Sequence, residues 1–492
     1  MAEGLVTIIS SENPSTLGKT YSLATDGTLT KKTAGQMLAG AFEVRAFSSA
    51  EDLATLLSGI TTAQALCSSV PVNGQRTGCI ATKATATTRT DAITRTKAEW
   101  QFAGAPGLLV LDYDAPQSGQ ALGLHAVWRA LVEMCPALAI AGVVGWFSGS
   151  SLIYSGDDQL TGERGSRLYV LIQDGKDTPR AIKALAARAW LHGHGRIEVS
   201  SSGSLLVRSL FDEAMAQSAR LDFIGGAVCS PPLSQRRGAP LVLGAGGFID
   251  SRSAIPDLSP DEATTVEALI AKAKATASGE ARTKRDAWMA GRVAEALPAL
   301  IGQGVAAGEA EETVRRVWQS AFAGTLLGSF ALTLVDESGA HEAVTVAQVL
   351  ANPERHDGRD CLDPLNPEHR GGAPDCRLFL LGASPIAYSL DDGGQVYHLR
   401  QQATRLTFAK GQRASLVDSL VAEVRNWPDV FKAGCDLVQV DGGSGGLKRL
   451  TPQRLSLLID SRCALYVQGS AGKTAAMDVQ KDIAELVLTA LQ

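Results

Sequence analysis

Long apolar runs are missing from this sequence. No window of about 18 consecutive apolar residues occurs, so no segment has the composition of a membrane-spanning helix. The first residues, Met1-Ala2-Glu3-Gly4, lack the basic flank and apolar core of a secretory signal peptide. These absences predict a cytoplasmic protein without a membrane partner.

Paired cysteines and aromatic residues are also scarce. The chain has eight cysteines but no Cys-x-x-Cys pair, which argues against a zinc ribbon and a disulfide framework. Aromatic residues make up 5% of the chain, which disfavours a protein that stacks many nucleic-acid bases. The net charge of −5 does not indicate nucleic-acid binding. It does not exclude it either, because basic residues can gather on one face.

The length and composition predict several hydrophobic cores in an α+β protein. The chain has 492 residues, of which 45% are hydrophobic, and residues 236–262 have the Arg, Gly, Ser and Pro content of a boundary. The helical part is expected to contain helices at 262–277, 281–300 and 309–323. The four expected regions are an α+β domain (1–250), a helical domain (260–330), a small β-rich domain (331–405) and a mixed α/β C-terminal region (406–492).

Residues 108–114, Leu-Leu-Val-Leu-Asp-Tyr-Asp, combine a buried strand with two acids. Side chains alternate along a strand, so Asp112 and Asp114 share a face, roughly 6 to 7 Å apart at Cβ. Two such charges repel unless a cation lies between them, and Mg²⁺ prefers oxygen ligands. The pattern fits a metal site at the edge of a sheet. A strand that runs into an Asp-rich turn, at Ala115-Pro116, fits it as well.

Two further predicted strands carry polar residues. The strand at 143–147 runs into Ser148-Gly149-Ser150-Ser151, whose small side chains let a phosphate or sugar approach the backbone. The strand at 165–172 carries Arg167 and Tyr169 on one face. These segments are candidates for nucleotide contacts.

Charged residues also interrupt the apolar segments between residues 205 and 223, at Arg208, Asp212, Arg220 and Asp222. A charged side chain is unfavourable to bury alone. These residues are therefore expected either to pair with one another or to serve a ligand or a metal ion.

Gly18-Lys19-Thr20 looks like the end of a phosphate-binding loop. The first glycine of the G-x-x-x-x-G-K-[ST] pattern, however, would fall on Asn13. The sequence therefore predicts no P-loop at this position.

The order of these motifs resembles the archaeo-eukaryotic primase (AEP) superfamily, specifically the primase-polymerases of plasmids, prophages and integrative elements. That superfamily has three strand motifs: an apolar run before D-x-D or D-x-E, a small residue two before a histidine, and a third acid after an apolar residue. Residues 110–114 match the first motif, and 165–169 match the second with arginine at the histidine position. Residues 206–212 match the third. The longer run 190–227 is similar to a mobile-element branch of this superfamily.

The resemblance implies an AEP-like catalytic domain in residues 1–250, built around a mixed or antiparallel sheet, in a DNA primase-polymerase. Asp112, Asp114 and Asp212 would bind two Mg²⁺ or Mn²⁺ ions, with Glu198 and Asp222 as alternatives for the third acid. Arg208 would contact template phosphate, orient Asp212 or form an ion pair with it. The residues implied in nucleotide binding are Arg167, Ser148, Ser150, Ser151, Tyr169 and Arg208.

The implied partners are a single-stranded DNA template, nucleoside triphosphates and a replicative helicase. In similar proteins the C-terminal segment precedes a helicase, and no helicase sequence is present here. The resemblance therefore implies either a stand-alone primase that recruits a helicase or a part of a longer chain.

Arg167 keeps a second function open. Arginine can donate to phosphate as a fixed fork, but it cannot shuttle a proton, because its pKa stays above about 12. The alternatives to an active primase-polymerase are a catalytically impaired, primase-like DNA-binding replication protein and another enzyme with paired carboxylates, such as a nuclease.

Overall fold

The structure is a computed structural model, and it mixes helices and strands throughout. The α+β class is therefore confirmed. None of the helices in the described part of the chain is long and apolar enough to cross a membrane. The described residues are 3–35, 37–82, 92–104, 106–116, 121–302, 307–336, 339–368, 372, 374–382, 384–390, 394–400, 404–409, 411–427, 429–440, 447–468 and 474–491.

The chain forms two compact units. Unit 1 contains Met1–Glu198 and Leu205–Ser278, and unit 2 contains Val199–Ser204 and Gly279–Gln492. The division at Ser278 lies inside a helix, later in the chain than the boundary expected at residues 236–262. Most of the three regions expected after residue 260 belong to unit 2.

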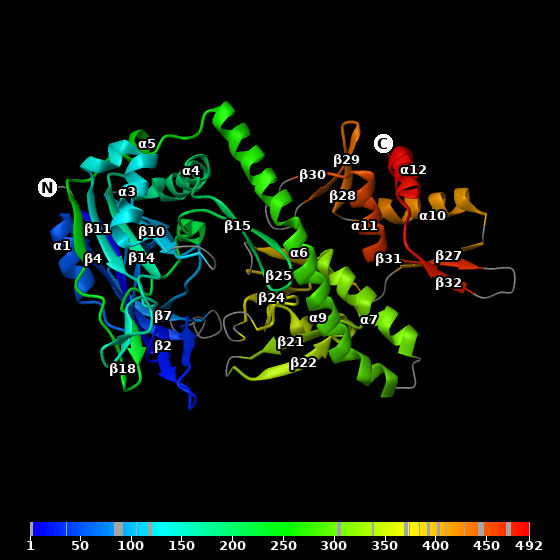
Figure 1. Cartoon of the computed structure of the whole chain (residues 1–492), viewed down its shortest axis with the longest axis horizontal. Coiled ribbons are helices and arrows are strands. Elements are labelled where there is room, and N and C mark those ends of the chain that lie inside the picture. The colour runs from blue at the N-terminus through cyan, green and yellow to red at the C-terminus, as the bar shows by residue number, and fades with distance from the viewer. Residues whose placement is uncertain are drawn as a thin grey trace. The chain divides into compact units, whose positions relative to one another are not determined.

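Four antiparallel strands form the central sheet of unit 1 (Figure 1). Three of them match strands that the sequence predicts, because their aliphatic runs are buried on both faces. In spatial order the strands are β10 (Gly107–Asp114), β14 (Gly165–Ile172), β11 (Gly142–Phe147) and β19 (Leu241–Ala245).

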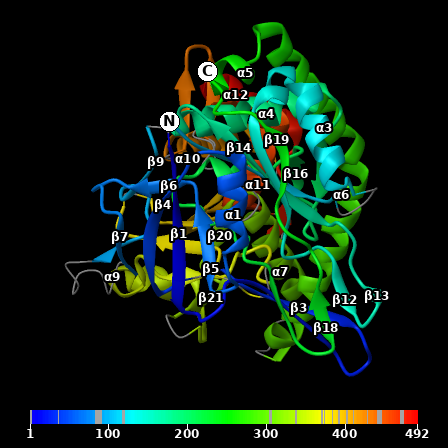
Figure 2. The ribbon, with the colours of Figure 1, turned by 90° about the vertical axis from the view of Figure 1, so that its left-hand side faces the viewer.

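Helix α3 (Leu124–Met134) covers one face of the central sheet, beside β14 and β19 in Figure 2. Gly145 of β11 leaves room for it, because a Cβ added there would lie 2.9 Å from Leu124 Cδ1. Leu168 and Leu111 are aligned with Gly145 across the sheet and face the same helix. Side chains alternate along a strand, so Asp112 points to the opposite face.

A second, larger sheet of unit 1 contains the first strand of the chain. Its order is β5 (Gln64–Cys67), β1 (Gly4–Asn13), β4 (Ala39–Phe47), β7 (Thr77–Ala81) and β8 (Ala92–Ile93). β7 and β8 are parallel, and the other neighbours are antiparallel. Both this sheet and the central sheet contribute buried residues to the main core, for example Val6 and Leu66 from the one and Leu109 and Tyr169 from the other.

Smaller elements complete the fold around these sheets. The small sheets are β17 (Ala227–Cys229), β2 (Gly18–Leu23) and β3 (Leu29–Ala34); β13 (Asp158–Gln159), β12 (Ile153–Ser155) and β18 (Leu233–Gln235); β15 (Arg196–Val199) and β16 (Leu205–Arg208); and β6 (Ser69–Pro71) and β9 (Trp100–Phe102). The remaining helices are α1 (Ala50–Ser58), α4 (Thr178–Leu191) and α5 (Ser251–Ala254), with 3₁₀ helices η1 (Pro136–Ile140), η2 (Gly175–Asp177) and η3 (Glu213–Ala216).

Helix α6 (Pro260–Gly302) is continuous where the sequence predicts two helices, at 262–277 and 281–300. Gly279 lies at the expected break, but a single glycine costs a helix only about 1 kcal/mol relative to alanine. Helix α7 (Ala307–Phe322) agrees with the third expected helix.

A seven-stranded sheet of unit 2 shares its core with these helices. Trp318 of α7 packs on Phe330 with ring centroids 4.9 Å apart, which explains why the helical and β-rich regions do not form separate units. Helices α8 (Val346–Ala351) and α9 (Pro353–His356) follow β22. The strands, in spatial order, are β20 (Thr325–Leu327), β26 (Gln395–Arg400), β25 (Ile386–Ser389), β24 (Cys376–Phe379), β23 (Asp360–Cys361), β21 (Ala331–Val335) and β22 (His341–Thr345).

The C-terminal part of unit 2 is mixed α/β, with its own hydrophobic cluster. Its helices are α10 (Arg413–Arg425), α11 (Pro452–Arg462) and α12 (Lys481–Leu491). Its strands form two sheets, β27 (Thr404–Ala409), β31 (Cys463–Gln468) and β32 (Thr474–Met477), and β28 (Val430–Ala433), β29 (Asp436–Val440) and β30 (Leu447–Arg449).

A buried ion pair joins the elements of this C-terminal part. Arg462, at the end of α11, is 1% exposed and donates to both carboxylate oxygens of Asp429 at 2.7 Å. Its guanidinium also lies 4.5 Å from the centroid of the Trp427 ring. Burial opposes the charge on Asp429, but the hydrogen bonds from Arg462 outweigh it and lower the pKa of Asp429 to about 2.

We predict that Asp429→Asn lowers the free energy of unfolding at neutral pH and makes it less dependent on pH below about pH 4. Because the pKa of Asp429 is lower in the folded chain than its ordinary 3.8, its contribution is complete above about pH 4. It is lost as the pH falls towards 2, and it amounts to about 2 kcal/mol. The test is to measure calorimetric unfolding midpoints of wild type and variant between pH 2 and 6. The difference between the two midpoints should shrink as the pH falls.

Asp482→Asn is the matched control for that measurement. Asp482 pairs with Arg413, but both side chains are about half exposed, so solvent screens the pair. Its variant should follow the wild-type pH profile. Equal pH profiles for Asp429→Asn and wild type would contradict the prediction.

Candidate functional site

The register of the central sheet places Asp112 opposite Arg167. Asp112 of β10 pairs with Arg167 of β14, and residues paired across antiparallel strands point to the same face. Tyr169 lies two residues further along β14 and shares this face, as the sequence predicts. Asp112, Arg167 and Tyr169 therefore lie on the same face of the central sheet.

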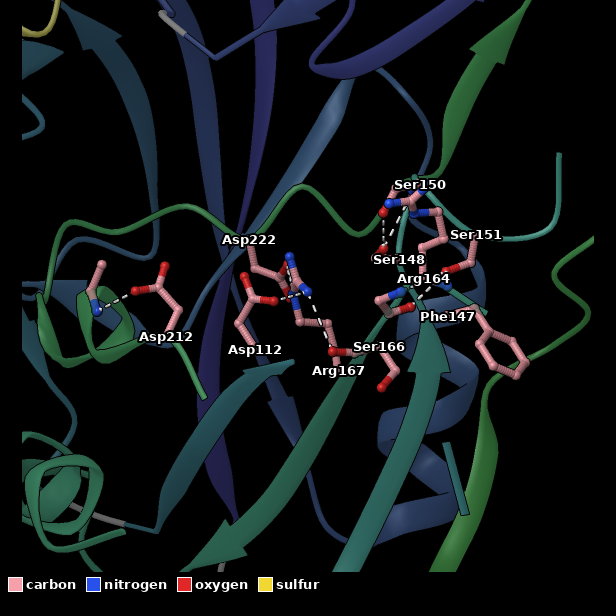
Figure 3. A network of polar contacts seen from close by, with 12 residues as sticks. Asp112, Phe147, Ser148, Ser150, Ser151, Arg164, Ser166, Arg167, Asp212 and Asp222 are labelled. Atoms are coloured by element: carbon pink, nitrogen blue, oxygen red, sulfur yellow. Dashed lines mark hydrogen bonds and ion pairs between the residues drawn. The ribbon is translucent and has the colours of Figure 1, made fainter. Parts of the chain in front are cut away.

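Arg167 lies between two carboxylates (Figure 3). Its Nη1 donates to Oδ1 of Asp112, and its Nε donates to Oδ1 of Asp222 at 3.0 Å. The exposed fractions of the side chains are 13% for Arg167, 11% for Asp112 and 2% for Asp222. The guanidinium that was expected on a triphosphate is thus engaged by two buried acids.

Tyr169 completes this network rather than reaching solvent. Its side chain is fully buried, and its hydroxyl donates to Oδ2 of Asp222 at 2.6 Å. Burial, followed by the charge of Asp222, raises the pKa of Tyr169, so the hydroxyl stays a proton donor. Tyr169 therefore supports an acid and has no free surface for the nucleotide contact that the resemblance implies.

Asp222 is fixed by its backbone as well as its side chain. Leu66 N–H donates to the carbonyl of Asp222 at 2.9 Å, and Asp222 N–H donates to the carbonyl of Leu66 at 2.8 Å. Leu66 belongs to β5, at the edge of the second sheet. The Arg167–Asp222 contact therefore joins the central sheet to the second sheet.

Asp212 is brought beside Asp112 by a backbone hydrogen bond. Asp212 N–H donates to the carbonyl of Asp112 at 2.8 Å. Its Oδ1 accepts a hydrogen bond from Ala214 N at 2.9 Å and caps η3, and Arg220 Nη2 lies 3.6 Å from its Oδ2. The Asp212 side chain is 40% exposed, so it has a surface for a ligand that Asp222 lacks.

Negative charge is in excess around Asp112. Burial is the main reason that the pKa of Asp112 is raised, to about 8, and the neighbouring Asp114, Asp222 and Asp212 raise it further. The Arg167 guanidinium opposes this shift but does not cancel it. A group of acids in this state gains stability when a further cation approaches.

Ser148 and Asp114 lie on either side of Gly165, at the end of the central sheet. A Cβ added at Gly165 would be 2.7 Å from Ser148 Oγ and 3.0 Å from Asp114 Oδ1. The Ser148 and Ser150 hydroxyls are hydrogen-bonded at 2.8 Å. These hydroxyls are therefore close to the exposed acid of the predicted pair.

Ser151 is a structural residue of the same loop. Its hydroxyl donates to the carbonyl of Gly165 at 2.8 Å and accepts from Arg164 N and Gly165 N at 3.0 and 2.9 Å. The side chain is fully buried. Its hydrogen-bonding capacity is used inside the protein, so the loop conformation, and not a nucleotide, accounts for this serine.

Glu198 and Arg208 pair with each other in the β15–β16 hairpin. Glu198 Oε1 accepts from Arg196 Nε at 2.8 Å, and its Oε2 accepts from Arg208 Nε at 3.4 Å. Glu198 is not among the acids that act on the pKa of Asp112. Of the three candidates for a third acid, Asp212 and Asp222 act on the pKa of Asp112. Arg208 pairs with Glu198, so the ion pair with Asp212, one of the alternatives considered for Arg208, is not formed.

The donor chemistry of the site suits a hard divalent cation. Asp112, Asp114 and Asp212 supply carboxylate oxygens, which Mg²⁺ and Mn²⁺ prefer. Within the described ranges, no three His, Cys, Asp or Glu side chains form an arrangement that could hold a metal ion. Asp112 instead keeps the guanidinium of Arg167 as its partner.

Two basic residues lie near the site although the sequence did not assign them to it. Arg237 stacks on Trp146, 3.6 Å from the ring centroid, and donates to the carbonyls of Phe147 and Ile224. Burial lowers the pKa of Arg237 to about 10. Lys19 of β2 lies near enough to Asp114 and Asp112 for both charges to act on it. Gly18-Lys19-Thr20 was rejected as a P-loop, and only the fold gives Lys19 this position.

We predict that Arg167→Met destabilises the central sheet by about 3–5 kcal/mol. The substitution leaves Asp112 and Asp222 buried without their cation, and breaking a buried ion pair has this cost. Hydrogen–deuterium exchange of peptides from β10 and β14 measures the free energy of local opening directly.

Arg45→Met serves as the control in the same unit. Arg45 pairs with Glu43 at 3.5 Å, but both side chains are about half exposed, and such pairs contribute less than about 1 kcal/mol. If Arg167→Met increased hydrogen–deuterium exchange in its strands as little as Arg45→Met does in its own, the prediction that the Arg167 network holds the sheets together would be wrong.

Comparison of the chain with protein-family models, with curated proteins and with solved structures gives no match. What the site can bind therefore follows from its own residues. These are the aspartates around Asp112, the guanidinium of Arg167 between two of them, and the serine hydroxyls at the end of the sheet.

Proposed function

We propose that this chain is a metal-dependent DNA primase-polymerase, a nucleotidyltransferase that copies single-stranded DNA in the replication of a mobile genetic element. The observation that carries the proposal is the 2.8 Å hydrogen bond from Asp212 N–H to the carbonyl of Asp112. It brings an acid from a separate segment next to the Asp112/Asp114 strand. It supports the proposal because the resemblance to AEP primases implies a third acid that acts with this pair.

The acids divide into two groups in this proposal. Asp112, Asp114 and Asp212 would hold Mg²⁺ or Mn²⁺, which would lower the pKa of the attacking 3′-hydroxyl and neutralise charge on the incoming triphosphate. Asp222 holds Arg167 and Tyr169, and the hydroxyls of Ser148 and Ser150 would donate to phosphate or sugar. A replicative helicase would act with the chain, in trans or within a longer protein.

A second candidate function is a catalytically impaired, primase-like protein that binds DNA. It is favoured by one specific observation, the contact between Arg167 and Asp112. A guanidinium is a permanent cation, and it occupies a carboxylate that the first proposal assigns to metal. In this function the acids and the arginine hold the fold together, and binding of DNA phosphates needs no divalent ion.

We predict that the protein extends a primer on a single-stranded template in the presence of labelled nucleotides and Mn²⁺, and that Asp112→Asn and Asp212→Asn abolish extension. Each change should lower the rate by about 100-fold or more, because a catalytic metal supplies several kcal/mol and 1.4 kcal/mol is a factor of ten. Gel analysis of the labelled products measures the rate.

Glu198→Gln is the discriminating variant in this assay. Glu198 belongs to the hairpin with Arg196 and Arg208, so its loss should leave the rate close to that of wild type. An inactive wild type that still binds labelled single-stranded DNA in EDTA would favour the second candidate. Degradation of the template without added nucleotides would favour a nuclease.

A further inference from the structure

Lys19 reaches the candidate site from a strand that is distant in the sequence. Strand β2 runs parallel to β17, with Lys19 aligned with Ala227, and antiparallel to β3, with Lys19 aligned with Thr33. Alternate residues face opposite sides, so Lys19 and Lys31 share one face of this small sheet, while Lys32 lies on the other.

Close backbone contacts join this small sheet to the serine loop. A Cβ added at Gly149 would lie 3.2 Å from the carbonyl oxygen of Gly226, and one added at Gly18 would lie 3.6 Å from the same atom. Gln235 ties the same region together, since its Oε1 accepts from Ala227 N at 2.8 Å and its Nε2 donates to the carbonyl of Ser148 at 3.2 Å. The strand that carries Lys19 is therefore held beside the serine loop.

Charges of the acid cluster act on Lys19. Burial lowers the pKa of Lys19, and the carboxylate of Asp114 has the largest opposing effect. Among the described residues, no hydrogen bond or ion pair within 4.0 Å engages its ammonium group. The charges that act on it belong to Asp114, Arg167, Lys31 and Asp112.

Lys19 thus differs from Arg167, the residue that the sequence assigns to phosphate. Arg167 is committed to Asp112 and Asp222, whereas Lys19 is influenced by the charges of Asp114 and Asp112, and no described residue forms a hydrogen bond with its ammonium. A partly buried ammonium gains most from a ligand that supplies strong, negatively charged acceptors. Phosphate oxygens are such acceptors, and the hydroxyls of Ser148 and Ser150 add donors near by.

We propose that Lys19 binds the phosphate chain of the nucleoside triphosphate, beside the Ser148–Ser150 loop. This inference rests on the proposed nucleotidyltransferase function, whose site it deepens. Lys19 acts as a binding residue that contacts the substrate. In this proposal Lys19 takes the phosphate-binding role that the resemblance implies for Arg167.

The test measures binding without metal and without turnover. Titration calorimetry with dATP, inorganic tripolyphosphate and deoxyadenosine, in EDTA at 0.15 M ionic strength, separates phosphate from base recognition. Lys19→Met should weaken dATP and tripolyphosphate binding by about 10-fold or more, because a hydrogen bond to a charged group is lost. Lys19→Arg should keep most of the affinity, and deoxyadenosine binding should not change.

Lys32→Met is the matched control, because Lys32 lies on the opposite face of the same two strands and is exposed. At this ionic strength exposed charges beyond about 8 Å are screened, so its removal should leave the affinity unchanged. Equal affinities of Lys19→Met and wild type for tripolyphosphate would overturn the inference, and so would the absence of dATP binding by wild type.

Failure of this inference is distinguishable from failure of the proposed function. If wild type extends primers and loses this activity in Asp112→Asn, but Lys19→Met binds dATP normally, the polymerase proposal stands and the role of Lys19 is refuted. If wild type extends no primer but binds tripolyphosphate through Lys19, the phosphate site stands without the polymerase activity.

Discussion

The contact of Arg167 with Asp112 and Asp222 is the interaction on which the rest of the site depends. One carboxylate comes from the neighbouring strand of the central sheet, and the other from a segment whose backbone pairs with the second sheet. Neither acid could be buried at this depth as a lone charge, because its desolvation would cost several kcal/mol. The guanidinium therefore joins the central sheet to the second sheet of unit 1, and Tyr169 satisfies the remaining oxygen of Asp222.

The same contact leaves a charge imbalance that defines what the site accepts. Asp114 and Asp212 add two further negative charges near Asp112, and Lys19 adds a positive charge without a close partner. A lone cation would suit the acids, and a lone phosphate would suit the lysine. A triphosphate that carries a divalent ion supplies both charges at once, and this is the reason that we propose nucleotidyl transfer rather than DNA binding alone.

Local patterns predicted the position of several strands and helices. The strands β10, β11 and β14 lie where aliphatic runs indicate them, because burial acts on each segment directly. The break expected between residues 277 and 281 is absent, because α6 is continuous. A lone glycine does not end a helix that tertiary packing supports, and Trp318 and Phe330 join regions that differ in composition.

The sequence by itself determined which side chains share a strand face, because strand alternation requires only neighbouring residues. It therefore placed Asp112 with Asp114 and Arg167 with Tyr169. Only the tertiary structure decided the partners across strands: Arg167 with Asp112 and Asp222, Glu198 with Arg208, and Lys19 with the acids. These partners depend on register and on pairing between distant segments, which are set by how the whole core packs and not by any local pattern.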